Sequence, residues 1–62
     1  MNKIVLNISR IKTARKLTWK ELAIKAGIKM RSWMAGGRDS PSEDELIKIA
    51  KALDVTVDEL KR

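Results

Sequence analysis

The stretch from Thr18 to Gly37, TWKELAIKAGIKMRSWMAGG, constrains the fold of this chain more than any other part of it. Thr18 and Glu21 have the spacing of a capping box, in which each side chain bonds a backbone amide at the start of a helix. Gly27 follows a run of helix-compatible residues, and glycine takes the left-handed backbone that ends a helix at little cost. The stretch therefore predicts a helix over 19–26 and a tight turn at Gly27.

A second short helix is expected after this turn, starting near Lys29 or Met30 and ending at about Ala35, where paired glycines follow. Two helices that meet at a steep angle need a small side chain where they touch, and Ala23 supplies one in the first helix. Trp33 is expected to face inward as the apolar anchor of the second helix. The spacing of this alanine, the turn glycine and the tryptophan indicates a helix-turn-helix.

Three further helices are expected in the rest of the chain, and no strand pattern or linker is visible. Apolar residues recur at helical spacing over 2–15, and Ser42 and Glu45 form a second capping box at the start of a helix over 42–53. Thr56 caps a last short helix. The apolar positions expected to form one core are Ile4, Ile8, Ile11, Leu17, Leu22, Ala23, Ile28, Trp33, Leu46, Ile49 and Leu53.

Composition argues against several classes of protein. The 62 residues allow one domain, over 1–62, and contain no cysteine or histidine. Disulfide bonds, thiolate metal sites and histidine general bases are therefore excluded, and we expect neither an enzyme nor a cofactor. The acidic run Glu43, Asp44 and Glu45 fits the first turn of a helix better than a metal site. No stretch approaches the roughly 20 apolar residues of a membrane span, and no signal peptide is visible, so we expect a cytoplasmic protein.

Charge is divided unevenly along the chain, whose net charge is +6. Residues 1–38 carry a net charge of +9, with Glu21 as their only acid, whereas residues 39–62 carry −3. A basic front half that contains the helix-turn-helix pattern favours a surface that binds polyanions. A solvated surface without such a partner is the alternative that charge alone leaves open.

The motifs resemble those of the Xre/Cro-type repressor domains, which have the lambda-repressor-like DNA-binding fold. Residues 17–28 match the L-T-x-x-E-L-A-x-x-x-G-V/I pattern of that family, and residues 41–60 match its P-S…L-x-x-I-A-x-A-L-x-V-x-x-D-x-L tail. The resemblance implies an all-α, compact five-helix domain whose second and third helices form the helix-turn-helix. It also implies a transcriptional regulator of bacterial or phage type, a repressor that binds double-stranded DNA through a helix in the major groove.

The chain departs from the family pattern mainly between these two matched segments. The family commonly has an I-E-N-G-like end to its third helix, where this sequence has MAGG at 34–37, and the segment 27–41 is shorter than usual. Gly36 stands where an apolar residue is usual, and Lys16 stands where glycine usually ends the first helix. Lys12 lacks the acidic partner that a base on the first helix often has. Most of these departures lie in the expected third helix and the loop after it.

By the same resemblance, residues at the start of the third helix reach base edges. The base-contact candidates are Lys29, Met30, Arg31, Ser32 and Ala35. The candidates for contacts to DNA phosphates are Thr18, Trp19, Lys20 and Arg38. Arg31 suits a bidentate contact to O6 and N7 of guanine, with a phosphate contact or an exposed surface position as its alternatives. For Trp19 the alternative is packing against Leu17 or the first helix.

Two further alternatives concern the partners of the protein. The same fold can serve as a protein-interaction module, such as an antitoxin or an accessory regulatory factor, although the basic residues concentrate on the half that holds the helix-turn-helix. The resemblance implies a weak homodimer, formed in solution or on DNA. Val55, Val57 and Leu60 could form its contact or could instead close the protein's own core.

Overall fold

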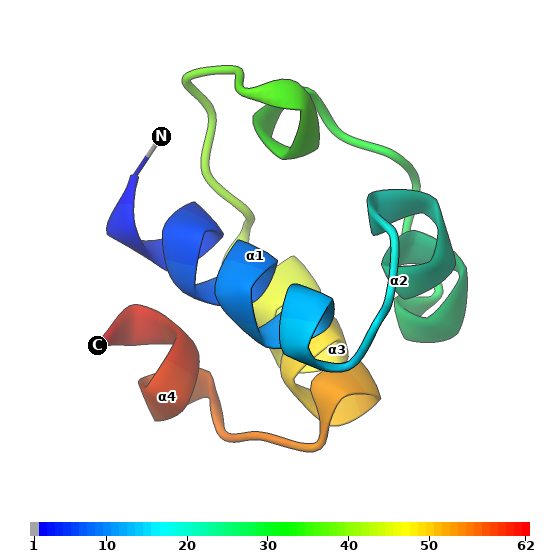
Figure 1. The fold of residues 1–62 in the computed structure, drawn as a ribbon. Coiled ribbons are helices and arrows are strands. Elements are labelled where there is room, and N and C mark those ends of the chain that lie inside the picture. Colours follow the sequence, from blue (N-terminus) through cyan, green and yellow to red (C-terminus); the bar gives the residue numbers. More distant parts are fainter. Residues whose placement is uncertain (1) are drawn as a thin grey trace.

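The structure, a computed structural model, describes residues 2–62 as α-helices joined by short turns and one piece of 3-10 helix (Figure 1). The elements are α1 (Lys3–Ala14), α2 (Trp19–Ala26), the 3-10 turn η1 (Ser32–Ala35), α3 (Glu43–Leu53) and α4 (Val57–Lys61). The predicted all-α class is confirmed for these residues, but they form four α-helices rather than the predicted five. No helix within residues 2–62 is long and apolar enough to cross a membrane.

Polar side chains define where each α-helix begins. Asn2 accepts a hydrogen bond from the Val5 amide at 2.8 Å and so caps α1. Each of the other α-helices begins with a capping box, and the pairs are Thr18 with Glu21, Ser42 with Glu45, and Thr56 with Glu59. These caps bond amides that have no partner inside the helix. The predicted starts of these four α-helices therefore agree with the observed ones to within one residue.

Residues with a left-handed backbone follow α1, α2 and α3. Gly27 has a φ of 73° and confirms the predicted turn, and its neighbour Ile28 donates its amide to the Ala23 carbonyl at 3.0 Å. Lys16 and Asp54 have φ angles of 59° and 58° in the corresponding places. Such angles are strained for a residue with a Cβ, so the turns after α1 and α3 form at a cost that glycine avoids.

The core is formed by all four α-helices together with η1. Its buried apolar side chains are Val5, Ile8, Leu22, Ala23, Trp33, Met34, Leu46, Ile49, Ala50, Leu53 and Leu60. Four residues predicted for the core instead lie half-buried at its edge, namely Ile4, Ile11, Leu17 and Ile28. The helix α1 is rotated so that Val5 and Ile8 face inward. Both Ile4 and Val5 are apolar, so the periodicity of α1 alone could not distinguish these two orientations.

Helix α1 crosses in front of α3 in Figure 1, with α2 on one side of the pair and α4 on the other. Helix α2 packs against α3, and α4 packs against both α1 and α3. The buried Asn7 side chain donates to the carbonyl oxygens of Leu60 at 3.0 Å and Arg62 at 3.2 Å, which fastens α4 to α1. Leu60 is fully buried, whereas Val55 and Val57 are half-buried, so Leu60 belongs to the protein's own core.

The predicted third helix, from 29 or 30 to 35, is wrong in its extent. Only Ser32–Ala35 is helical, and it forms a single 3-10 turn. Arg31 has an extended backbone and gives η1 no side-chain cap, while Gly36 ends the turn with a φ of 91°. Gly37 donates its amide to the Ser32 carbonyl at 2.9 Å, where a Cβ would lie only 2.8 Å from that oxygen. Because a helix nucleus is costly, an uncapped run that meets glycines does not extend into an α-helix.

Candidate nucleic-acid interface

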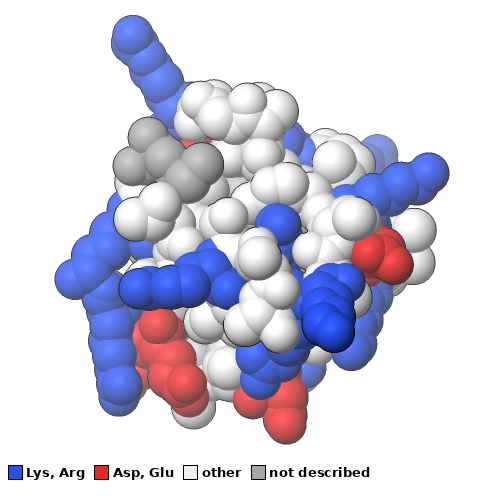
Figure 2. Space-filling view, viewed as in Figure 1, with Lys and Arg blue, Asp and Glu red and all other residues white. Residues whose placement is uncertain are grey.

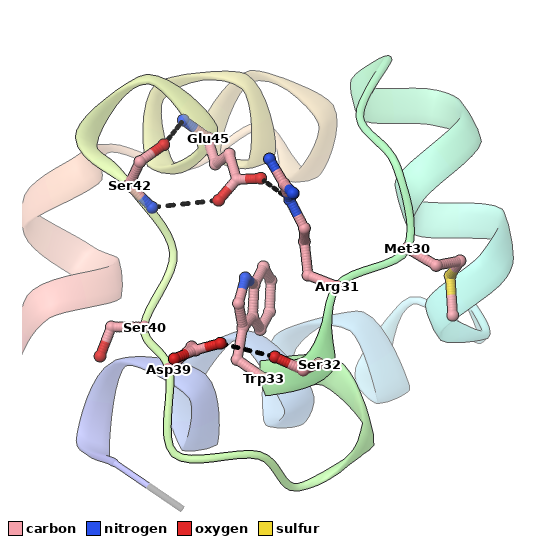
Figure 3. A pocket seen from close by; sticks show the side chains of 8 residues that line it. All are labelled: Met30, Arg31, Ser32, Trp33, Asp39, Ser40, Ser42 and Glu45. Atoms are coloured by element: carbon pink, nitrogen blue, oxygen red, sulfur yellow. Dashed lines mark hydrogen bonds and ion pairs between the residues drawn. The ribbon is translucent and has the colours of Figure 1, made fainter.

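The loop from α2 to α3 borders a hollow of about 440 Å³ beside the first turn of α3 (Figure 3). The hollow is lined by Met30, Arg31, Ser32, Trp33, Asp39, Ser40, Ser42 and Glu45. Three base-contact candidates, Met30, Arg31 and Ser32, therefore lie together at its rim. Lys29 and Ala35 are exposed but do not line it, so the structure brings together only part of the predicted set.

Arg31 is held by an ion pair that crosses the loop. Its Nε donates to Oε2 of Glu45, in the first turn of α3, at 2.6 Å. The other oxygen of that carboxylate, Oε1, accepts from the amide of Ser42 at 3.1 Å as part of the capping box. One buried carboxylate therefore joins the start of α3 to the segment that carries the base-contact candidates (Figure 3).

The surroundings of Glu45 favour the charged form of its carboxylate. Burial raises its pKa, but the hydrogen bond and charge of Arg31 and the amide of Ser42 lower it, and the net pKa lies below the usual value. The indole nitrogen of Trp33 lies on the ring edge that faces this carboxylate and lowers the pKa further (Figure 3). That nitrogen is buried, and no group within residues 2–62 meets hydrogen-bond geometry with it. The carboxylate of Glu45 is thus ionised at neutral pH.

Two polar contacts fix the loop on its way to α3. The hydroxyl of Ser32 donates to Oδ2 of Asp39 at 2.7 Å, which joins η1 to the segment before α3. Asn2, the cap of α1, donates from its side chain to the hydroxyl of Ser40. Ser32 is therefore engaged within the protein, whereas Met30 is 56% exposed and points toward α2 (Figure 3).

Trp33 is confirmed as an inward-facing anchor, with 2% of its surface exposed. Trp19 packs edge-on against it, with ring centroids 5.7 Å apart and ring planes at 88°. Lys12 places Nζ 4.8 Å from the Trp19 ring centroid, a cation–π geometry, and 3.5 Å from the carbonyl oxygen of Leu17. Trp19 therefore packs mainly against Trp33, a partner that the sequence did not indicate, and Lys12 connects it to α1. The ring gives Lys12 a partner in place of an acid.

The phosphate-contact candidates lie outside the hollow. Lys20 and Arg38 are exposed, and Thr18 is exposed but uses its hydroxyl to accept from the Glu21 amide at 3.1 Å. Trp19 is half-buried by its contact with the other tryptophan. Figure 2 shows Lys and Arg side chains spread over the face that carries α1, with acidic side chains mainly toward its lower edge. This face therefore carries mostly positive charge.

Sequence patterns do not reveal Glu45 as a partner of Arg31. They assign Glu45 to its capping box alone, because Ser-x-x-Glu is a local signal. The contact with Arg31 spans 14 residues and depends on the path of the loop between them. No local spacing rule relates positions so far apart. The only sequence signal for this contact is therefore the opposite charge of Arg31 in the loop and Glu45 after it.

Comparison with known proteins bears on this whole region. A protein-family model described as helix-turn-helix matches residues 8–60. The matched range contains α2, η1 and α3 in full and most of α1 and α4, so it includes the hollow and every base-contact and phosphate-contact candidate. No curated protein and no solved structure matches the chain.

Proposed function

Because the chain belongs to the helix-turn-helix family of Xre and lambda-repressor-like proteins, we propose that it is a transcriptional repressor that binds specific sites on double-stranded DNA. The family is one of DNA-binding regulators rather than enzymes. The observation that carries the proposal is the match over residues 8–60, within which the segment 29–35 is largely exposed and follows the turn at Gly27. This is where the element that enters DNA is expected.

In the proposed complex α2 crosses the DNA backbone and the segment 29–35 enters the major groove. Residues 29–31 are not helical and η1 is a single turn, so a largely exposed, mostly non-helical segment takes the place of a longer recognition helix. Arg31 is proposed to contact guanine, because its terminal nitrogens remain available while its Nε is bonded. The other proposed base contacts are Lys29, Met30, Ser32 and Ala35.

Electrostatic attraction supports DNA as the partner of this surface. Residues 1–38 carry a net charge of +9, and neutralising phosphates releases counterions that drive binding. The proposed phosphate contacts are Thr18, Trp19, Lys20 and Arg38. We further propose that the chain acts as one domain, and that two copies occupy two half-sites through a weak contact formed on DNA.

Selection of bound sequences from a random duplex pool at near-physiological salt tests the proposed function. We expect enrichment of one short sequence, in two symmetric copies if two chains bind together. The distance between the copies would give the spacing of the half-sites. If no sequence were enriched, sequence-specific binding would be contradicted, and a protein-interaction module on the same fold would be favoured.

Replacing Lys20 with alanine should weaken binding to all duplex sequences alike. A lost phosphate contact should also reduce the slope of log affinity against log salt by about one. Fluorescence anisotropy at several salt concentrations measures both effects, and Arg38→Ala is expected to behave in the same way. Lys48→Ala is the matched control, because Lys48 lies on α3 in the acidic half and pairs with Asp44 at 3.3 Å. Equal effects at Lys20 and Lys48 would show that net charge, rather than a phosphate contact, determines the affinity.

A further inference from the structure

We propose that Glu45 is a positioning residue for base recognition, which holds Arg31 so that the terminal nitrogens of its guanidinium are presented to the edge of a guanine. The inference rests on the proposed function and deepens it. It adds a residue that would not itself touch DNA but would determine how one base is recognised.

The Glu45 side chain is firmly placed by the start of α3. Its Oε1 accepts from the amide of Ser42 at 3.1 Å, and its own amide donates to the Ser42 hydroxyl at 3.2 Å. The side chain is 11% exposed. Both bonds involve the backbone of a helix start, so the carboxylate has little freedom to move and its second oxygen has a fixed position.

The ion pair uses only the inner nitrogen of the Arg31 guanidinium. Nε lies 2.6 Å from Oε2 of Glu45, while 54% of the Arg31 side chain remains exposed. The two terminal nitrogens each carry N–H groups in a fixed planar fork. One N–H from each of them matches O6 and N7 on the major-groove edge of guanine. A side chain that is already held in place loses less rotamer freedom when it binds.

The other two capping boxes show that this ion pair does not follow from helix capping alone. Glu21 and Glu59 occupy the same position in the boxes of α2 and α4, and both are exposed. Within residues 2–62 the structure gives neither of them a salt bridge. Glu45 alone of the three is buried, and its partner is the arginine of the segment proposed to enter the groove.

An acid can also withhold an arginine from DNA, and the exposure of Arg31 argues against that arrangement here. A withheld guanidinium would be covered and bonded through its terminal nitrogens. Among residues 2–62, Nε is the one guanidinium nitrogen of Arg31 with a hydrogen bond, and more than half of the side chain is exposed. The arginine is therefore held through Nε, while its terminal nitrogens make no hydrogen bond within residues 2–62.

Glu45→Gln tests the proposal with little change to the start of α3. Glutamine serves the same position in a capping box, so its carbonyl oxygen can keep the bond from Ser42. Its amide nitrogen then faces Arg31 as one donor facing another, which releases the arginine. Glu43→Gln is the matched control, because it removes the same charge from the same turn, where Glu43 pairs with Lys61 at 3.1 Å.

Binding is measured on the sequence selected by the wild-type protein and on duplexes changed at each of its positions. We expect Glu45→Gln to weaken binding about tenfold and to flatten the preference at one guanine, as Arg31→Ala does. In an Arg31→Ala background the same substitution should change the affinity less than about twofold. Glu43→Gln should leave the base preference unchanged.

Three results would overturn the proposal. Tighter binding by the Glu45→Gln variant would mean that the acid withholds Arg31, and an unchanged base preference would mean that it does not position Arg31. If Glu45→Gln lowered the affinity equally in the Arg31→Ala background, the effect would come from the fold of α3 rather than from Arg31. Thermal unfolding of each variant measures any such loss of stability separately. Enrichment of no sequence by the wild-type protein would instead defeat the proposed function itself, and this inference with it.

Discussion

Replacing Trp33 with alanine is expected to lower the free energy of unfolding by about 3–5 kcal/mol. Trp33 is 2% exposed and packs edge-on against Trp19, so alanine would lose this contact and leave a cavity in the core. Domains have about 0.05–0.15 kcal/mol of stability per residue, which gives roughly 3–9 kcal/mol for these 62 residues. A large part of the variant population should therefore be unfolded at 25 °C.

Denaturant unfolding, monitored by far-ultraviolet circular dichroism, measures how much free energy of unfolding the Trp33→Ala variant loses. Trp19→Ala is the matched control, since it removes the same ring and the same ring-to-ring contact from a half-buried position. We expect a smaller loss from this control, because less apolar surface leaves the core. If the Trp33 variant unfolded at the wild-type midpoint, the placement of Trp33 as the anchor of the segment 29–35 would be contradicted.

Replacing Leu60 with alanine is expected to lower the free energy of unfolding by about 2–5 kcal/mol, although α4 is only five residues long. The reason is that Leu60 is fully buried. The same substitution at Leu6, which is 55% exposed, should change the free energy of unfolding by less than about 0.5 kcal/mol. The two variants therefore compare one side-chain change in a buried and in an exposed position.

Thermal unfolding at several protein concentrations, without DNA, completes the test of Leu60. The midpoint should not depend on concentration, because Leu60 is buried within one chain rather than between two. If Leu60→Ala lowered the free energy of unfolding as little as Leu6→Ala does, Leu60 would have to lie at the surface of the single chain. A midpoint that rises with concentration would show that contacts between two copies stabilise the fold.

Local signals predict the helix starts and the turn at Gly27 because each depends on residues within about one helical turn. The boxes that begin with Thr18 and Ser42 are observed with both of their reciprocal bonds, and Gly27 has the expected left-handed backbone. Ala23 is 3% exposed in α2, so it lies in the core as predicted. The framework of α2, the turn and α3 could therefore be predicted from the sequence.

The extent of η1 and the contacts around it could not be predicted in this way. A short helix exists only where tertiary contacts support it, and the sequence over 29–35 does not show that Arg31 adopts an extended backbone and bonds Glu45. The contact between Ser32 and Asp39 likewise depends on the path of the loop. The surface position of the base-contact candidates was predictable from the family pattern, whereas the partners of their side chains were not.

The shared carboxylate of Glu45 has a consequence for how this sequence can evolve. Exchanging Arg31, the proposed guanine contact, for another residue would leave a buried carboxylate without its charged partner. Exchanging Glu45 would disturb the start of α3 together with the segment 29–35. A lineage that acquires a new base preference is therefore expected to change both positions, so that residues 31 and 45 should covary among homologous sequences.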